Sequence, residues 1–220
     1  THHLPPLFLL LEDETLATRS ASLRLLGRLS RYNPAPILPP LRRLLMELIL
    51  ILQCGGDSSA LTSDPTAREA ATRMMISFFR ANALHRLIHP FLPSILASLP
   101  HTLDSPPRLA VAALEALGDL AAVSHSDLRP WGPSLIPCIL ESLRDRSVQK
   151  QRTGFATLGL LVGGTGEVIT PYLTYPRLLP TAAAVLPHAK RAPWELRREV
   201  IRTFGILGAL DPQRYYREVV

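Results

Sequence analysis

The feature that most constrains this chain is a small residue that recurs at a near-regular interval. Each copy lies inside a segment whose apolar side chains repeat every three to four residues, the pattern of an amphipathic helix. The intervals between successive copies are 50, 41, 41 and 46 residues. The five positions are Gly27, Ser77, Gly118, Gly159 and Gly205. Such regular recurrence indicates one structural unit repeated along the chain.

A period of about 40–47 residues is typical of HEAT and armadillo repeats, whose unit contains paired helices. Aromatic residues make up only 6% of the chain, and leucine and alanine supply most of its apolar side chains, which favours helix packing over a β-sandwich. The sequence therefore predicts an all-α fold, an α-solenoid of about five HEAT-like antiparallel helix pairs that form a single array. The predicted units cover residues 4–32, 35–85, 88–128, 131–168 and 171–213.

Each unit is predicted to contain two helices joined by a turn. Many of the 21 prolines fall where a helix would begin, a position that proline tolerates. The Gly-, Ser- and Asp-rich segment 54–65 is predicted to be a loop, which explains the longest interval. The first helices are expected near residues 5–11, 39–53, 90–103, 133–143 and 175–186. The second helices are expected near residues 15–30, 66–82, 109–120, 147–162 and 194–210.

A glycine inside a helix costs about 1 kcal/mol relative to alanine, so its recurrence at one position calls for a packing reason. We interpret the small residue as the point where the two helices of one unit cross, because a side chain there would push them apart. On this interpretation, replacing Gly159 with leucine is expected to destabilise the fold.

Some charged residues recur at a fixed number of positions before the small residue. Asp13, Asp104 and Asp145 each precede their glycine by 14 residues and fall in the turn between two predicted helices. A carboxylate there can cap the next helix and interact with the positive end of its dipole. Arg19 and Arg197 each precede their glycine by eight residues. We interpret them as structural arginines that pair with a turn carboxylate of a neighbouring unit, while an acidic partner is the alternative for Arg197.

The net charge of +6 comes almost entirely from arginine and is spread thinly along the chain. It is compatible with solvated helix faces and also with an acidic or phosphate-bearing partner. Cys54 and Cys138 lie far apart, which indicates a reducing compartment without a disulfide framework. The longest apolar run, residues 44–52, is broken by Glu47 and is too short to cross a bilayer, so no transmembrane segment is predicted.

Residues that could carry chemistry are sparse. The run Gly163-Gly164-Thr165-Gly166 lacks the Lys-Ser/Thr of a phosphate loop and follows a helix, so we interpret it as a helix C-cap and turn. His85 and His89 could share a helix face, but no third metal ligand is near in sequence. No nucleophile elbow or kinase signature is present. We predict no catalytic, cofactor-binding or metal-binding residue in this chain, and no small-molecule substrate.

Three stretches resemble a known family. They are LRREVIRTFGILGALDP (196–212), GRLSRYNPAPILPPLRRLLMELI (27–49) and GGTGEVITPYLTYPRLLP (163–180). In order and approximate separation they resemble the helical array that lies N-terminal to the kinase domain of target-of-rapamycin (TOR) Ser/Thr protein kinases. Two places differ from the family: the 54–65 segment is longer, and residues 213–216 replace a basic, histidine-containing tail.

The resemblance implies a non-catalytic scaffold segment of a kinase that couples nutrient and growth signals to cell growth. It implies protein partners, namely a raptor-type subunit and the dimer mate of a TOR complex. ATP and Mg²⁺ would bind in a kinase domain outside these residues. The implied location is cytoplasmic, at endomembrane, lysosomal or vacuolar surfaces, or nuclear. With no initiator Met and no signal-peptide pattern, the chain is expected to be an internal piece of a longer protein.

Two alternatives remain beside the TOR hypothesis. One is a HEAT scaffold of another class, such as a transport receptor or a coat adaptor, since helix-pair architecture alone does not determine function. The other is a basic solenoid that binds nucleic-acid phosphates. That hypothesis requires arginine side chains lining one face and binding that falls steeply with salt.

Overall fold

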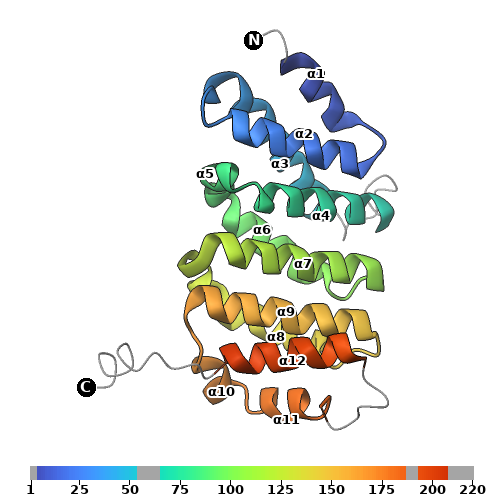
Figure 1. The fold of residues 1–220 in the computed structure, drawn as a ribbon, viewed down its shortest axis with the longest axis vertical. Coiled ribbons are helices and arrows are strands. Elements are labelled where there is room, and N and C mark those ends of the chain that lie inside the picture. Colours follow the sequence, from blue (N-terminus) through green and yellow to red (C-terminus); the bar gives the residue numbers. More distant parts are fainter. Residues whose placement is uncertain (1–3, 54–64, 187–192, 208–220) are drawn as a thin grey trace, which may run out of the picture. The chain divides into compact units, whose positions relative to one another are not determined.

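The computed structural model describes residues 4–53, 65–186 and 193–207, and every regular element within these ranges is a helix (Figure 1). The predicted all-α fold is therefore confirmed. The chain divides into two compact units, Thr1–Val123 and Ser124–Val220. The finer division into five repeats stays a prediction.

The first compact unit is built around three long helices, α2, α4 and α7, which correspond to predicted second helices of the repeats. The helix α3 packs against both α4 and α6 (Figure 1). The elements of this unit are α1 (Leu4–Leu9), η1 (Leu10–Glu12), α2 (Leu16–Leu29), α3 (Pro34–Gln53), α4 (Pro65–Arg80), η3 (Asn82–Leu84), α5 (His85–Ile88), η4 (His89–Phe91), α6 (Leu92–Ser98), η5 (Pro100–Thr102) and α7 (Pro107–Ser124).

Apolar stripes at helical spacing form the core of this unit. On α3 the stripe repeats every three or four residues, and on α4 two pairs of adjacent large side chains point inward. The removal of these side chains from water is the main stabilising contribution to the packing. The buried side chains of α3 and α4 include Ile37, Leu41, Leu45, Leu48, Leu52, Met74, Met75, Phe78 and Phe79.

Two helical segments of the first unit, both rich in proline, differ from the prediction. The helix α3 begins at Pro34 rather than Pro39, because Ile37 already belongs to its buried stripe. Pro39 and Pro40 are exposed inside α3, so the carbonyl groups left without an N–H donor face water. The predicted single helix 90–103 is instead broken into η4, α6 and η5, since prolines interrupt the hydrogen-bond ladder at the start of each piece.

The second compact unit is organised around α9, which packs against α8 on one side and α12 on another (Figure 1). Phe155 and Leu158 of α9 and Val200 of α12 are fully buried. The elements of this unit are η6 (His125–Trp131), α8 (Gly132–Ser142), α9 (Val148–Thr165), α10 (Thr170–Thr174), α11 (Leu178–Ala183) and α12 (Trp194–Ile206).

The ends of the helices in the second unit can be compared with the prediction. Gly166 adopts a left-handed conformation with φ of 73° and caps α9, which confirms the Gly-rich run as a helix end. Gly163 and Gly164 lie inside α9, so the helix is about one turn longer than expected. The predicted helix 175–186 is interrupted: α10 ends before Pro176, and α11 begins at Leu178. Residues 54–64 of the predicted loop 54–65 and residues 208–210 of the last predicted helix lie outside the described residues, while Pro65 already belongs to α4.

One helical stretch among the described residues, Pro107–Ser142, is long and apolar enough by length and composition to cross a membrane. It includes α7, η6 and α8. Of its most apolar window, 67% is buried against the rest of the structure. Burial of this kind is what the core helix of a soluble protein also shows.

Candidate interaction surface

Two of the recurring small residues, Gly27 and Gly159, face the next predicted repeat along the chain. A Cβ added to Gly27 of α2 would lie 3.4 Å from Cγ of Leu84, just beyond α4. A Cβ added to Gly159 of α9 would lie 3.3 Å from Cδ1 of Ile206 and 3.4 Å from Oγ1 of Thr203, both on α12. The prediction that the two helices of one unit cross at this residue is therefore wrong at both glycines. At Gly159 the added Cβ would be slightly tighter than an ordinary van der Waals contact with α12, whereas at Gly27 it would make ordinary contacts.

The other three small residues have different surroundings. The hydroxyl of Ser77 on α4 lies 2.8 Å from the hydroxyl of Ser20 on α2, so a hydrogen bond joins these two helices. Gly118 is buried within α7. A Cβ added to Gly205 on α12 would meet no described atom within 4 Å.

The crossing within one repeat falls instead at Gly154, which the sequence reasoning missed. A Cβ added there would lie 2.8 Å from Cδ2 of Leu143, at the end of α8. Gly154 precedes Gly159 by five residues. The residues five positions before three of the other markers are also small and buried, and this recurrence was the available signal. They are Ser22, Thr72 and Ala113.

Two of the three predicted turn carboxylates make the same hydrogen bond. Oδ1 of Asp13 accepts the N–H of Thr15 at 2.8 Å, and Oδ1 of Asp145 accepts the N–H of Ser147 at 2.8 Å. These backbone donors, assisted by the Thr15 hydroxyl and by Lys150 respectively, hold the pKa of each carboxyl below its ordinary value of 3.8. Thr15 and Ser147 are the N-cap residues of α2 and α9, so the ionised carboxylates stabilise helix starts. Asp104 is exposed in the corresponding turn.

The repeated arginines have partly buried guanidinium groups. Nε of Arg19, Arg68 and Arg197 is buried and has no hydrogen-bond partner among the described residues. The predicted pairing of Arg19 and Arg197 with a turn carboxylate is therefore not made through this atom.

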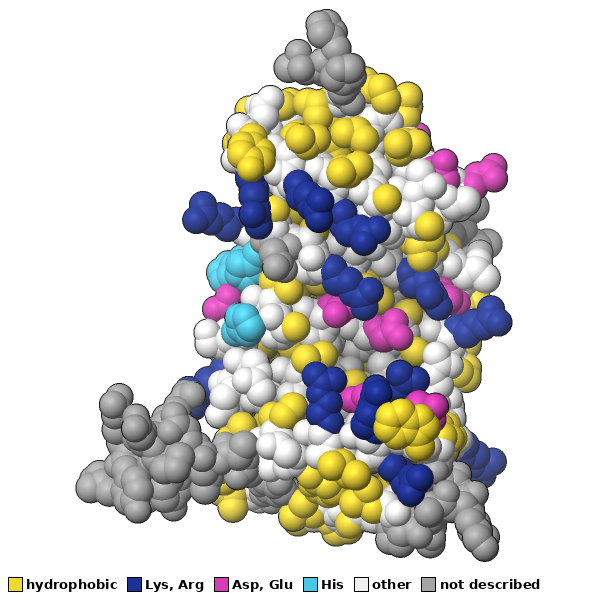
Figure 2. Space-filling view, viewed as in Figure 1, with side chains coloured by type: hydrophobic (Ala, Val, Ile, Leu, Met, Phe, Trp, Pro, Cys, Tyr) yellow, Lys and Arg dark blue, Asp and Glu magenta, His cyan; other side chains and the backbone are white. Residues whose placement is uncertain are grey.

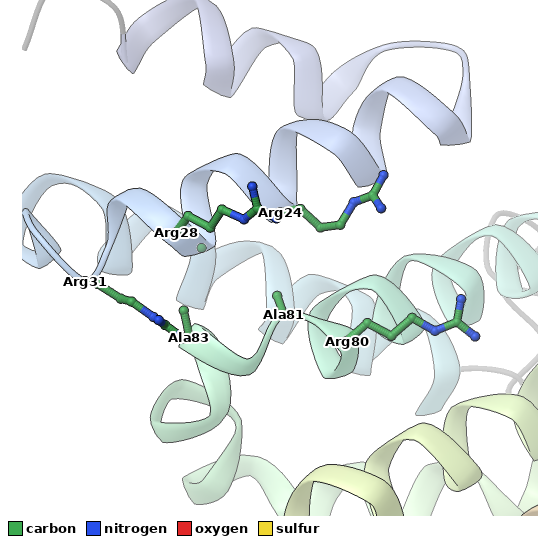
Figure 3. Close-up of a pocket in the computed structure, with 7 residues that line it drawn as sticks. Arg24, Arg28, Arg31, Arg80, Ala81 and Ala83 are labelled. Atoms are coloured by element: carbon green, nitrogen blue, oxygen red, sulfur yellow. The ribbon is translucent and has the colours of Figure 1, made fainter.

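A recess that we name the arginine groove lies where α2 meets the end of α4 (Figure 3). It encloses about 220 Å³. Four arginines line it, and three small residues leave it open. The lining residues are Arg24, Gly27, Arg28, Arg31, Arg80, Ala81 and Ala83.

The helix α2 explains how three of these arginines come together. Arg24, Arg28 and Arg31 are spaced four and three residues apart, so they project from one side of the helix and the turn that ends it. The stretch 16–31 contains no Asp or Glu. Figure 2 shows Lys and Arg side chains gathered across the face formed by α2 and α4. The sequence reasoning identified the excess of arginine but not this clustering.

The fourth arginine comes from α4 and is partly neutralised. Nε of Arg80 donates to Oδ2 of Asp119 on α7 at 2.8 Å. Burial raises the pKa of the Asp119 carboxyl, although Arg80 acts in the opposite direction. On α2, Nε of Arg24 donates to the carbonyl of Ser20 at 3.3 Å. The side chains of Arg28 and Arg31 form no hydrogen bond or ion pair with other described residues.

A larger recess of about 570 Å³ adjoins the arginine groove and shares Arg31 and Ala83 with it. Its lining is mostly apolar, with one histidine whose Nδ1 is buried and unpartnered. The rings of that residue, His85, and of His89 meet edge to face with centroids 6.4 Å apart. In the part of the chain that the structure describes, no three potential metal ligands gather. The lining residues are Ser30, Arg31, Pro34, Leu38, Ala83, His85, Arg86 and Leu87.

The chemistry available to the arginine groove is binding. Arginine stays protonated in proteins and presents planar, multiple N–H donors, so it holds anions but does not act as a general base. The fold is that of an all-helical protein built from packed helices, and the cationic recess lies between α2 and the end of α4.

The chain belongs to the family of TOR serine/threonine kinases. Residues 168–219 match the family described as the serine/threonine-protein kinase mTOR domain. The chain is 35% identical to serine/threonine-protein kinase tor1 of Schizosaccharomyces pombe and to serine/threonine-protein kinase TOR of Arabidopsis thaliana, over 95% and 97% of its length. It is 34% identical to serine/threonine-protein kinase mTor of Drosophila melanogaster over 96% of its length.

The chain corresponds to a small part of these kinases. It spans 9% of the Schizosaccharomyces protein and 8% of each of the other two. Among solved structures, an engineered protein superposes with a TM-score of 0.59 at 12% identity, covering 93% of this chain and 96% of that one. At this level of identity the likeness supports the fold alone. The chain is therefore a helical segment of a TOR kinase.

Proposed function

We propose that this chain is a non-catalytic scaffold segment of a TOR kinase, which supports assembly of the kinase complex and binds partner proteins. The observation that carries the proposal is the 35% identity to TOR kinases over at least 95% of the chain, together with a fold made of packed helix pairs. Helix-pair arrays present long surfaces whose exposed side chains are free to contact other proteins.

The division of labour in the whole kinase follows from the same proposal. ATP and Mg²⁺ are handled by a kinase domain outside these residues, while the present helices position other parts of the complex. The proposed partners are a raptor-type subunit and the second copy of the kinase in a dimer. The proposed location is the cytoplasm, including endomembrane surfaces on which nutrient signals are received.

Exposed apolar side chains on the first compact unit support a role in contacts. On α2 and the turn after it, Leu25, Leu29 and Tyr32 are exposed by 47%, 39% and 88%. On α3, Met46 and Leu50 are exposed by 47% and 54%. Apolar side chains at helical spacing on a surface are typical of segments that pack against further protein.

The test is an internal deletion of residues 4–207 from the full-length kinase, with purification through a tag on the kinase domain. We expect the deleted kinase to phosphorylate a short peptide while it loses the accessory subunit or the dimer. A catalytically inactive full-length kinase is the matched control and should assemble normally. Normal assembly of the deleted kinase would show that the chain is not a scaffold.

Crosslinking of the intact complex gives an independent readout that does not depend on folding of the deleted protein. Lys150 of α9 is the lysine within the described residues, so a reagent that also couples carboxylates is required. Under the proposal, exposed carboxylates of this chain crosslink to an accessory subunit or to the second kinase copy. Crosslinks confined to the chain itself would contradict it.

A further inference from the structure

We propose that the arginine groove binds a phosphorylated segment of a protein partner, with the phosphoryl group of a phosphoserine or phosphothreonine in the recess. The inference rests on the proposed scaffold function in that a partner protein supplies the segment. It adds a defined site and a ligand chemistry to that function.

The donors of the groove fit a phosphoryl group. A phosphorylated side chain carries about −1.5 to −2 charges at neutral pH and three strong acceptor oxygens. The side chains of Arg28 and Arg31 have no hydrogen-bond or ion-pair partner within the described part of the chain, and Arg24 projects from the same side of α2. Guanidinium groups donate to phosphate oxygens in bidentate geometry, and clusters of arginine are a recurrent means of recognising phosphorylated motifs.

The floor of the groove explains why the arginines enclose a space instead of filling it. Gly27 has no side chain, and Ala81 and Ala83 have only methyl groups. The resulting volume of about 220 Å³ accommodates a phosphoryl group together with part of the side chain that bears it. Figure 3 shows Arg31 extending toward Ala83, while Arg24 and Arg80 extend along their helices.

The surroundings of the groove favour a peptide over a polymer of phosphates. The adjoining recess of about 570 Å³ is lined by Pro34, Leu38 and Leu87, which suit an apolar side chain next to the phosphorylated residue. Asp119 lies at the other side of Arg80 and would repel a continuous polyanion that ran along the helices. A nucleic acid needs a longer track of cations and makes little use of an apolar recess.

The experiment uses the full-length kinase and a pool of fluorescent synthetic peptides with a fixed central phosphoserine or phosphothreonine and randomised flanking residues. Binding is measured by anisotropy for the wild type, for the double variant Arg28→Glu/Arg31→Glu, and for Arg108→Glu. Arg108 is an exposed arginine of α7, outside the groove, and gives a matched change of charge. All substituted arginines are exposed, so their replacement leaves the core intact.

We expect the double variant to bind the phosphopeptide pool at least about tenfold more weakly, since two charge-assisted contacts are replaced by repulsion. The Arg108→Glu kinase should bind within about twofold of the wild type, because its charge lies outside the site. Sequencing of retained peptides should show apolar residues enriched beside the phosphorylated position. Equal binding by all three kinases would overturn the proposal.

Further arms of the experiment separate the chemistry from related ligands. Pools with unmodified Ser/Thr or with Glu at the central position should bind weakly, and comparable binding of the Glu pool would overturn the phosphoryl assignment. Single-stranded RNA and vesicles containing phosphatidylinositol phosphates are tested with the same three kinases. If either ligand depends on Arg28 and Arg31 while the phosphopeptides do not, the assignment to a peptide is wrong.

Failure of this inference can be told apart from failure of the scaffold function. Co-purification of the accessory subunit and the dimer mate is measured for the same Arg28→Glu/Arg31→Glu kinase. Normal assembly with lost phosphopeptide binding supports the groove as a site distinct from the assembly contacts. Unchanged phosphopeptide binding overturns the groove alone, whereas normal assembly after deletion of residues 4–207 overturns the scaffold function.

Discussion

The hydroxyl of Thr203 on α12 lies 2.8 Å from the backbone carbonyl of Phe155 on α9 and also 2.8 Å from the carbonyl of Glu199 on α12, so these two buried acceptors share its one proton. The hydrogen bond to Phe155 joins α12 to α9, the second helices of two predicted repeats, in the second compact unit. Thr203 is 3% exposed, and the side chain of Phe155 is fully buried. This polar contact constrains how α12 is oriented on α9. The two helices otherwise meet through apolar side chains and at Gly159.

Replacing Thr203 with valine tests this junction, because valine keeps the shape and removes the hydroxyl. We expect a loss of about 1 kcal/mol in the free energy of unfolding, the typical net contribution of a buried hydrogen bond. The measurement is denaturant unfolding followed by circular dichroism. The exposed Thr174→Val is the control and should leave the midpoint unchanged. An unchanged midpoint for Thr203→Val would show that the bond adds nothing.

Gly159 and Gly205 occupy the same place in their repeats but have opposite surroundings. Gly159→Leu is expected to destabilise the chain by about 1–3 kcal/mol, because α12 lies within contact distance. Gly205→Ala is expected to stabilise it by up to about 1 kcal/mol, since the new methyl group meets no described atom and alanine favours the helix. Thermal melts of the two variants should therefore shift in opposite directions, and parallel shifts would refute the packing explanation.

Asp145 is expected to stabilise the fold only while it is ionised. Its folded-state pKa is lowered, first by the N–H of Ser147 and then by Lys150, so its contribution is present above the ordinary value of 3.8 and is lost as pH falls through the lowered pKa. Asp145→Ala should therefore lower the melting temperature near pH 6, and the difference from wild type should shrink toward about pH 3. A difference that is constant with pH would exclude this account. Asp13→Ala should show the same trend, because the N–H of Thr15 lowers the pKa of Asp13.

Arg80→Ala is also expected to destabilise the fold only at higher pH, but here the carboxyl group concerned, Asp119, has a raised pKa. Burial raises the pKa of Asp119, so ionised Asp119 disfavours folding as pH rises from the ordinary value of 3.8 through the raised folded-state pKa. Loss of Arg80 removes the cation that offsets this burial. The variant should be destabilised near neutral pH and should approach the wild type as pH falls toward and below the ordinary value of 3.8, because Asp119 gains its proton in both. Equal destabilisation at both pH values would contradict the role assigned to Asp119.

The second helix of each predicted repeat could be predicted because its apolar residues follow one period over three or more turns, as in α4 and α12. The first helices were harder to predict. Prolines at 90, 93, 100 and 176 break them into short pieces, and the apolar pattern alone does not show whether a helix continues through a proline. The period also shows which residues share a face but not which neighbouring helix that face meets. This is why the partner of Gly159 was predicted wrongly and Gly154 was missed.

The arginine groove shows a second limit of sequence reasoning. Arg24, Arg28 and Arg31 at helical spacing could have indicated a cationic face of α2. Arg80 lies 49 residues beyond Arg31, and only the packing of α4 against α2 brings the two together. The openness of the recess depends on Gly27, which the sequence reasoning had assigned to another contact. Basic residues that are widely spaced in the sequence are thus brought together at one place in the fold.

Because glycine sits where one repeat meets the next, the angle at such a joint is set by very few atoms. A methyl group gained at Gly159 would lie 3.3 Å from Cδ1 of Ile206, so that side chain would have to move slightly, whereas one gained at Gly27 would make ordinary contacts with Leu84 and Ala81. The contact between α9 and α12 can therefore be adjusted by a single substitution at Gly159, while a substitution at Gly27 is absorbed without such an adjustment.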